Sequence, residues 1–374
     1  FYCSDQILMK EGVFLVGQGA GTSLNEQAWH PIGQTRLRVS ATLNGKYLVD
    51  FAGGYGIANM KNSGGLAGLR LEGQFHTIDN CSGVRIKGWI SPVLRDVFVY
   101  QFKGEGLRLD DVWDGWFGNV HVTECGRAAS QNYAVLLTSN AGNPANDNVN
   151  ACRFVHLRVE AAAYRALYVG EQCWQNTFLG LKIHGPGTDP LLWFYKAGPN
   201  DFLGGVLTAG GDRGIYATQS EGCSFDGMKL ITITGDGIQL SNTSDFCFTN
   251  LYFDSVTGQE INILNAGCNR TTIAGCVEKT GALGITDNGT DTRIWPGDQP
   301  PTAHGAAKHT GATLPGAADE DFGAHFADMD EIAAPANPAA GTRRVFVDQA
   351  THKISVKTVS YTHSPSPRDR QKSR

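Results

Sequence analysis

The chain has 374 residues and a formal net charge of −5, and 41% of its residues are hydrophobic against 18% charged. This length and apolar content suffice for a large buried core, and the negative charge argues against a nucleic-acid partner. No apolar run reaches the roughly 18 residues of a membrane span, and no signal peptide is visible. Because the chain starts at Phe1 rather than Met, we expect a fragment whose true N-terminus is missing.

Residues 1–80 are expected to form an N-terminal cap and the first coils of a repeat. The segment GVFLVGQGAGTSL, from Gly12 to Leu24, combines a strand-like run with a glycine-rich turn. A phosphate-binding loop is not indicated there, because no GK[ST] follows the glycines and no helix is opened.

Residues 81–295 contain a ladder of similar segments. An aromatic residue with apolar residues at positions +3 and +5 recurs at Phe117, Phe154, Phe178, Phe202, Phe225 and Phe248, and the last four steps are 24, 24, 23 and 23 residues. A second ladder lies between these segments, at Leu167, Leu191, Ile215, Ile238, Ile261 and Ile285. Two ladders with one period indicate stacked supersecondary units.

The segments are short, rich in Val, Ile, Phe and Tyr, and bounded by turn residues, so they predict strands rather than helices. At about 3.3 Å per residue, some 23 residues hold about three short strands and their turns. The sequence therefore predicts an all-β fold, a single-stranded, right-handed parallel β-helix with about 23–24 residues per coil.

The succession WDGWFGNVHVTECG, FVHLRVE and NTFLGLKIHG, together with the opening glycine-rich segment, resembles the pectate-lyase-like β-helix superfamily, and tailspike-type proteins of phages and prophages in particular. The resemblance covers roughly residues 12–295. It implies a homotrimer, a polysaccharide or cell-surface glycan as partner, and a location on a virion tail or outside the cell. It does not choose the chemistry, because this superfamily holds hydrolases, lyases, epimerases and binders.

The remaining residues change in composition. Residues 296–335 are rich in Pro, Ala and Gly and predict a linker. Residues 336–359 predict a hairpin with strands at Arg344–Val347 and Lys353–Lys357, which needs a packing partner because a lone hairpin is marginally stable. Residues 360–374 show no apolar period and are expected to be a disordered or non-native tail.

Nine cysteines without a CxxC motif indicate buried thiols rather than disulfides, with Cys152, Cys173, Cys223, Cys247, Cys268 and Cys276 in or beside the repeats. The ten histidines show no HxH or HExxH spacing, so no metal site is predicted. No motif points to a cofactor.

In such a fold, equivalent positions of successive coils stack about 4.8 Å apart. Position +4 after each Phe is expected to face outward, which places His121, Arg158 and Lys182 together. Position +6 brings Glu160 beside His184, with Glu124 one position later in its coil. Carboxylates one or two rungs apart suit the spacings of glycosidases, although a mixed-charge solvated face would look the same.

A second acidic group lies in LDDVWDGWFG, where Asp110, Asp111 and Asp114 accompany Trp113 and Trp116 at a predicted turn before Phe117. Acids beside aromatic rings are typical of sugar sites, while turn aspartates beside core tryptophans are the alternative. Two insertions, GRAASQN from Gly126 and SNAGNPANDNVN from Ser139, are expected to lengthen the coils on one side and to wall a groove near Glu160.

Three hypotheses follow for function. The first is a polysaccharide depolymerase of the glycoside hydrolase type, with Glu124 and Glu160, or the Asp110 group, as acid and base. The second is a polysaccharide lyase in which Lys182, Arg158 or His184 takes a proton and cations neutralise a substrate carboxylate. The third is a structural or adhesive β-helix without catalysis.

Overall fold

The structure, a computed structural model, describes residues 1–19, 35–40, 43, 45–73, 81–126, 133–140, 142–144, 146–162, 164–185 and 189–295, and the backbone of 343–348 and 353–358. The chain divides into two units, Phe1–Ala312 and Thr313–Arg374. The regular elements of the described residues are strands, and none of these residues forms an α-helix. No helix long and apolar enough to cross a membrane occurs within these ranges.

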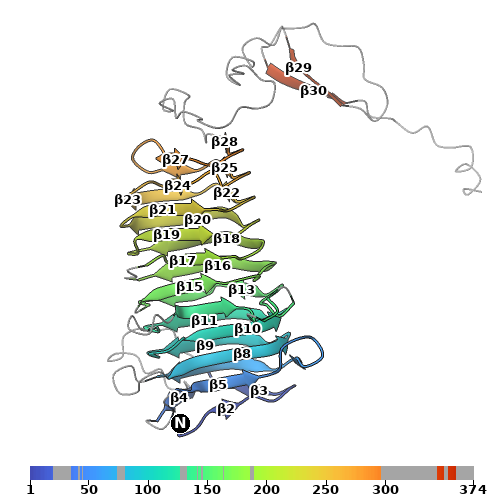
Figure 1. The fold of residues 1–374 in the computed structure, drawn as a ribbon, viewed down its shortest axis with the longest axis vertical. Coiled ribbons are helices and arrows are strands. Elements are labelled where there is room, and N and C mark those ends of the chain that lie inside the picture. The colour runs from blue at the N-terminus through green and yellow to red at the C-terminus, as the bar shows by residue number, and fades with distance from the viewer. Residues whose placement is uncertain are drawn as a thin grey trace, which may run out of the picture. The chain divides into compact units, whose positions relative to one another are not determined.

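The first unit is a parallel β-solenoid of about nine turns (Figure 1). Sheet A, with 16 strands among the described residues, contains β1 (Tyr2–Cys3), β3 (Phe14–Val16), β4 (Thr35–Val39), β7 (Gly65–Glu72), β9 (Val93–Tyr100), β11 (Trp116–Thr123), β13 (Arg153–Val155), β14 (Arg158–Glu160), β16 (Asn176–His184), β18 (Asn200–Thr208), β20 (Ser224–Ile233), β22 (Cys247–Thr249), β23 (Tyr252–Val256), β25 (Thr272–Ala274), β26 (Val277–Glu278) and β28 (Arg293–Trp295).

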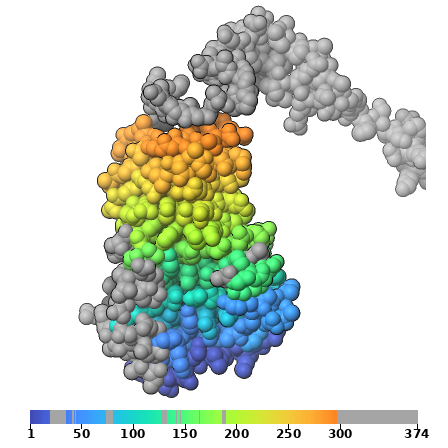
Figure 2. Space-filling model, viewed as in Figure 1, coloured from blue at the N-terminus to red at the C-terminus, as the bar shows by residue number. Residues whose placement is uncertain are grey.

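Sheet B, with 12 strands in the described ranges, contains β2 (Ile7–Leu8), β5 (Tyr47–Ala52), β6 (Lys61–Asn62), β8 (Ser82–Ile90), β10 (Leu107–Trp113), β12 (Tyr133–Thr138), β15 (Arg165–Val169), β17 (Leu192–Tyr195), β19 (Arg213–Thr218), β21 (Asp236–Ser241), β24 (Ile261–Ile263) and β27 (Ile285–Asp287). The chain alternates between the sheets, so each coil adds one rung to both. Figure 2 shows the result as colour bands that follow the sequence along the solenoid.

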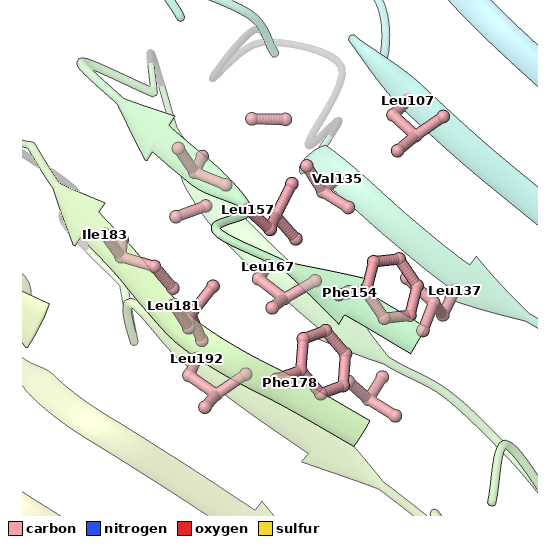
Figure 3. Packing of buried hydrophobic residues seen from close by; sticks show 14 of the residues in the cluster. Leu107, Val135, Leu137, Phe154, Leu157, Leu167, Phe178, Leu181, Ile183 and Leu192 are labelled. Carbon is pink, nitrogen blue, oxygen red and sulfur yellow. The ribbon is translucent and has the colours of Figure 1, made fainter. Parts of the chain in front are cut away.

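The core confirms the predicted aromatic ladder. Phe154 stacks on Phe178 (Figure 3), with ring centroids 4.4 Å apart. Phe178 in turn stacks on Phe202 at 4.5 Å. The stack continues through Phe225 to Phe248, and all five rings are buried. Burying one such ring contributes about 2–3 kcal/mol to the stability of the fold. Because the period aligns the rings, each one is buried by its neighbours in the stack.

A backbone kink explains why the apolar pattern runs +3 and +5 rather than +2 and +4. The residue at position +2 has a left-handed φ in every coil of the ladder, for example 56° at His156, 66° at Gly180 and 54° at Asn250. Such a residue acts like a bulge and resets the alternation of side chains. At His156 and Asn250 the kink divides the strand of sheet A in two, so these coils hold the three predicted strands, whereas several others hold two.

The second ladder was predicted one residue out of register in one coil. Leu167 pairs with Leu192, and Leu192 pairs with Ile215, so Leu192 rather than Leu191 belongs to the column. The ladder continues as predicted through Ile238, Ile261 and Ile285. Both leucines are fully buried, so hydrophobicity alone did not separate them.

All nine cysteines lie within the described residues and are free thiols. Seven are buried, while Cys3 and Cys247 are half-buried, so the predicted burial of Cys247 was only partly right. In the second unit, β29 (Arg343–Asp348) and β30 (Lys353–Thr358) pair antiparallel, as the sequence predicted. The linker at 296–335 and the tail at 360–374 lie outside the described residues.

Candidate functional site

Four charged or titratable side chains meet on the outer face of sheet A. Arg158 Nη2 lies 2.5 Å from Glu160 Oε1, and Lys182 Nζ lies 2.9 Å from the same oxygen. His121 Nε2 approaches the other oxygen, Oε2, at 3.3 Å. The strand register aligns His121, Arg158 and Lys182 on successive rungs. We call Glu160, Arg158, Lys182 and His121 the Glu160 centre.

The Glu160 centre carries more positive than negative charge. Burial alone would raise the pKa of Glu160, but the bonds from Lys182 and Arg158 and the charge of Arg158 hold that pKa below its ordinary value. Burial lowers the pKa of His121 to about 4, although the Glu160 carboxylate opposes this. At neutral pH, the centre therefore holds an ionised carboxylate, a neutral imidazole and two cations.

Two predicted neighbours of Glu160 lie beside it in different ways. His184 pairs with Glu160 in the strand register and is exposed, as predicted for a residue that ends a core strand. The histidine whose ring nitrogen approaches the Glu160 carboxylate, however, is His121, which is itself buried rather than solvent-facing and whose ring lies 4.6 Å from that of Phe98. Glu124 donates its backbone N–H to Glu160 O at 3.0 Å, and its carboxylate accepts a bond from Gln101.

The first 80 residues contain a similar centre that sequence reasoning missed. Glu72 stands in the same column as Glu160, through Tyr100 and Thr123. Its carboxylate lies 2.6 Å from Arg70 Nε and 2.6 Å from Arg38 Nη2, and it is as buried as that of Glu160. The sequence signal was the spacing of Arg70 and Glu72 by two residues, as in Arg158 and Glu160.

The Asp110 group is spread over strand and turn. Asp110, Asp111 and Trp113 lie in β10 rather than in the predicted turn, and only Asp114 follows the strand. Asp110 is buried and paired with Arg108 at 2.9 Å. Asp111 is 0% exposed and accepts a bond from Gly56 N at 3.0 Å. Burial raises its pKa to about 6, and nearby Asp147 adds to the rise.

The two tryptophans of this segment lie in different sheets. Trp113 is half-buried in sheet B, and Trp116 begins the next strand of sheet A with 41% of its surface exposed. The predicted aromatic pair therefore does not form one platform with the aspartates.

The two insertions leave opposite ends of β12, not one side as predicted. Gly126–Asn132 joins β11 to β12, at the end of sheet A where Glu160 lies, and residues 127–132 fall outside the described residues. Ser139–Asn150 joins β12 to β13, and its Asp147 lies near Asp111. The Ser139–Asn150 insertion therefore lies at the end of sheet A opposite to the Glu160 centre, because each strand crosses the full width of its sheet.

Sheet B carries aromatic residues that the sequence analysis did not single out. Leu136, Tyr168, Trp193 and Tyr216 occupy one outward column on successive rungs. Within the described ranges, no group of three or more His, Cys, Asp or Glu side chains is placed to hold a metal ion.

The comparisons with known proteins bear on the fold. A scan of protein-family models and a search of curated proteins give no match. Among solved structures, ORF18 of Geobacillus virus E2 is 18% identical with a TM-score of 0.52, covering 79% of this chain and 52% of its own. Pre-mature bacteriophage phi29 gene product 12 is 8% identical with a TM-score of 0.53, covering 79% of this chain and 47% of its own.

Tailspike protein 2 of the Escherichia coli O157:H7 bacteriophage CAB120 is 13% identical with a TM-score of 0.45, covering 70% of this chain and 38% of its own. The chain thus spans about half the length, or less, of these structures. The chain is a parallel β-helix protein, with a fold that it shares with virus proteins, and phage tailspikes are among its structural neighbours.

Proposed function

We propose that this chain binds and cleaves a polysaccharide, with the Glu160 centre as its reactive site. The observation that carries the proposal is the meeting of Arg158, Lys182 and His121 on one carboxylate across three rungs. The two cations are 38% exposed, so a ligand on the outer face of sheet A can reach them. A β-helix suits a long glycan, because its rungs repeat along one axis as sugar units do.

Hydrolysis would use the ionised Glu160 as general base or nucleophile. A carboxylate whose pKa is held low by two cations stays ionised at neutral pH. Glu124, which adjoins Glu160 through its backbone, would offer the second carboxyl that glycosidases use. In this proposal Glu124 takes the role of the acid, because the Glu160 carboxylate is already bound by two cations.

Elimination is the second candidate, and the excess of cations favours it. Arg158 and Lys182 share one carboxylate, so a positive charge remains for a uronate carboxylate of the substrate. The exposed His184 on the next rung would take the proton beside that carboxylate, and the cations would stabilise the anion that forms.

Product analysis on neutral and anionic polysaccharides tests both candidates. Elimination leaves an unsaturated sugar that absorbs in the ultraviolet, while hydrolysis yields reducing ends without that absorbance. Glu160→Gln should lower either activity by about 100-fold or more. Glu72→Gln is the matched control, since it removes an equally buried, arginine-paired carboxylate from the same column. Equal losses in both variants, or none in Glu160→Gln, would contradict the proposed site.

We further propose that the protein acts as a homotrimer on a virion tail or outside the cell. The two-stranded hairpin of β29 and β30 supports this, because an isolated hairpin needs a partner surface to be stable. Free thiols throughout the solenoid fit a chain that folds under reducing conditions before release.

A further inference from the structure

Four aromatic side chains form a continuous strip on the outer face of sheet B. The ring of Tyr133 lies 4.7 Å from that of Tyr168, which lies 5.7 Å from Trp193, and Trp193 lies 5.8 Å from Tyr216. All four are half-buried, so each ring keeps part of its surface open to solvent. We call these four residues the aromatic strip.

Arg165 contacts Tyr133 and Trp193 and fixes their positions in the aromatic strip. Its Nη1 donates to Tyr133 Oη at 2.8 Å, and its guanidinium lies 4.7 Å above the ring of Trp193. Its Nε donates to Asp189 at 2.5 Å, and its Nη2 donates to Tyr164 Oη at 3.0 Å. Because this planar group is bound on three sides, it holds the rings at fixed angles before any ligand arrives.

The cations along the strip are neutralised locally. Arg165 pairs with Asp189, and Arg213, which lies 4.6 Å above the ring of Tyr216, pairs with Asp212 at 2.8 Å. Neither arginine is left to bind an anion. This differs from the Glu160 centre, where two cations share one carboxylate.

Polar groups surround the rings and continue the column. Burial raises the pKa of Tyr133 and of Tyr168, so both hydroxyls stay protonated and can donate hydrogen bonds. Above Tyr216 the column continues with Gln239 and Asn262, whose amides both donate to Asp236. Rings flanked by hydroxyls and amides suit a ligand with apolar faces and many hydroxyl groups.

We propose that the aromatic strip is a second polysaccharide-binding site, specific for uncharged pyranose chains that lie along the solenoid axis. Pyranose rings present flat apolar faces that stack on aromatic rings, while their hydroxyls meet the tyrosines and amides at the edges. Arg165 and Arg213 are each paired with an aspartate, and Asp236 adds a further carboxylate beside the column, so an anionic chain would be repelled there while an uncharged chain would not. Arg165 is a positioning residue for this site.

The inference rests on the proposed function in one respect, that the ligand is a polysaccharide. The two are separable by experiment, because the strip lies on sheet B and the Glu160 centre on sheet A. Binding can be measured without cleavage by affinity electrophoresis through gels that contain dextran, galactomannan, mannan or xyloglucan, with polygalacturonate and alginate as anionic probes.

Trp193→Ala should weaken retention by a neutral polysaccharide about tenfold or more, the usual effect of removing a central aromatic anchor. Trp295→Ala is the matched control, because Trp295 is 55% exposed on sheet A. Glu160→Gln should keep this retention even where it abolishes cleavage. If Trp193→Ala does not fold, as its unfolding transition will show, Tyr216→Gln on the next rung takes its place.

Arg165→Lys should also weaken retention while Trp193 fluorescence still responds to saturating glycan, since lysine keeps the charge but lacks the planar guanidinium that lies over Trp193 and reaches its partners through three separate nitrogens. The proposal is overturned if no neutral polysaccharide retards the wild type, or if only the anionic probes do. It is equally overturned if Trp193→Ala lowers the molecular mass measured by light scattering, because the strip would then be an interface between copies of this chain.

Discussion

Phe154 and Phe178 stack in the solenoid core with their ring planes 5° apart and their centroids 4.4 Å apart. Phe178 repeats the relationship with Phe202 at 3°. Each ring therefore packs against one ring below and one above, so the rungs depend on one another. Stability of such an array is set by contacts between neighbours.

Phe178→Ala should lower the free energy of unfolding by roughly 3–5 kcal/mol, because it opens a gap between two rungs that cannot close without bending the sheet. Urea unfolding followed by circular dichroism measures this. Leu179→Ala is the control on the same strand, since Leu179 is 45% exposed, and its cost should stay within about 0.5–1 kcal/mol. Equal costs would contradict the packing described here.

His121 should make the protein less stable in mild acid. Its pKa falls from the ordinary 6.5 to about 4 on folding, so the unfolded chain binds a proton that the folded chain refuses. The stability linked to neutral His121 is full above pH 6.5 and is lost as the pH falls towards 4, by roughly 2–3 kcal/mol. His121→Gln should flatten this part of the profile of unfolding free energy against pH, and an unchanged slope would count against it.

Asp111 should make the protein less stable as the pH rises, the opposite of the effect of His121. Its pKa rises from 3.8 to about 6 on folding, mainly through burial, so the stability linked to its protonated form is full below pH 3.8 and is lost as the pH rises through 6. Asp111→Asn keeps the shape and tolerates the left-handed φ of 52°. The variant should be about 2 kcal/mol more stable than wild type near pH 8 and no more stable near pH 3.5.

Asp114→Asn provides the comparison for that measurement. Asp114 has a similar φ of 54° but is exposed, so its replacement should leave the pH profile within about 0.5 kcal/mol of wild type. A shift of the same size in both variants would show that the backbone conformation, and not burial of the carboxyl, is responsible.

Assembly can be tested with the chain as it stands. We expect light scattering to give the mass of a trimer, and expect removal of residues 336–374 to lower it, because the hairpin has too little core of its own. A monomer under conditions where the solenoid is folded would contradict the proposed homotrimer.

The period of the chain determined the fold. A repeat of 23–24 residues with short β-branched and aromatic segments allows few structures other than a parallel solenoid, and the ladder from Phe154 to Phe248 stacks as predicted. Local pattern also placed Glu160 beside His184 and aligned Arg158 with Lys182. These inferences succeeded because stacking in register follows from spacing alone.

Only the tertiary structure decided which side chains meet across the surface. The sequence pattern placed Leu191 in the core column, and this one-residue error concealed the aromatic strip. With Leu192 in the column, Tyr168, Trp193 and Tyr216 each directly follow a core residue. His184 is the strand partner of Glu160, but the side chain that contacts the Glu160 carboxylate is His121, because side-chain direction and depth of burial decide the contact. Spacing gives the rung on which a residue lies, but rotamers, turn geometry and burial fix its partner and its pKa, and these depend on neighbours that are distant in the sequence.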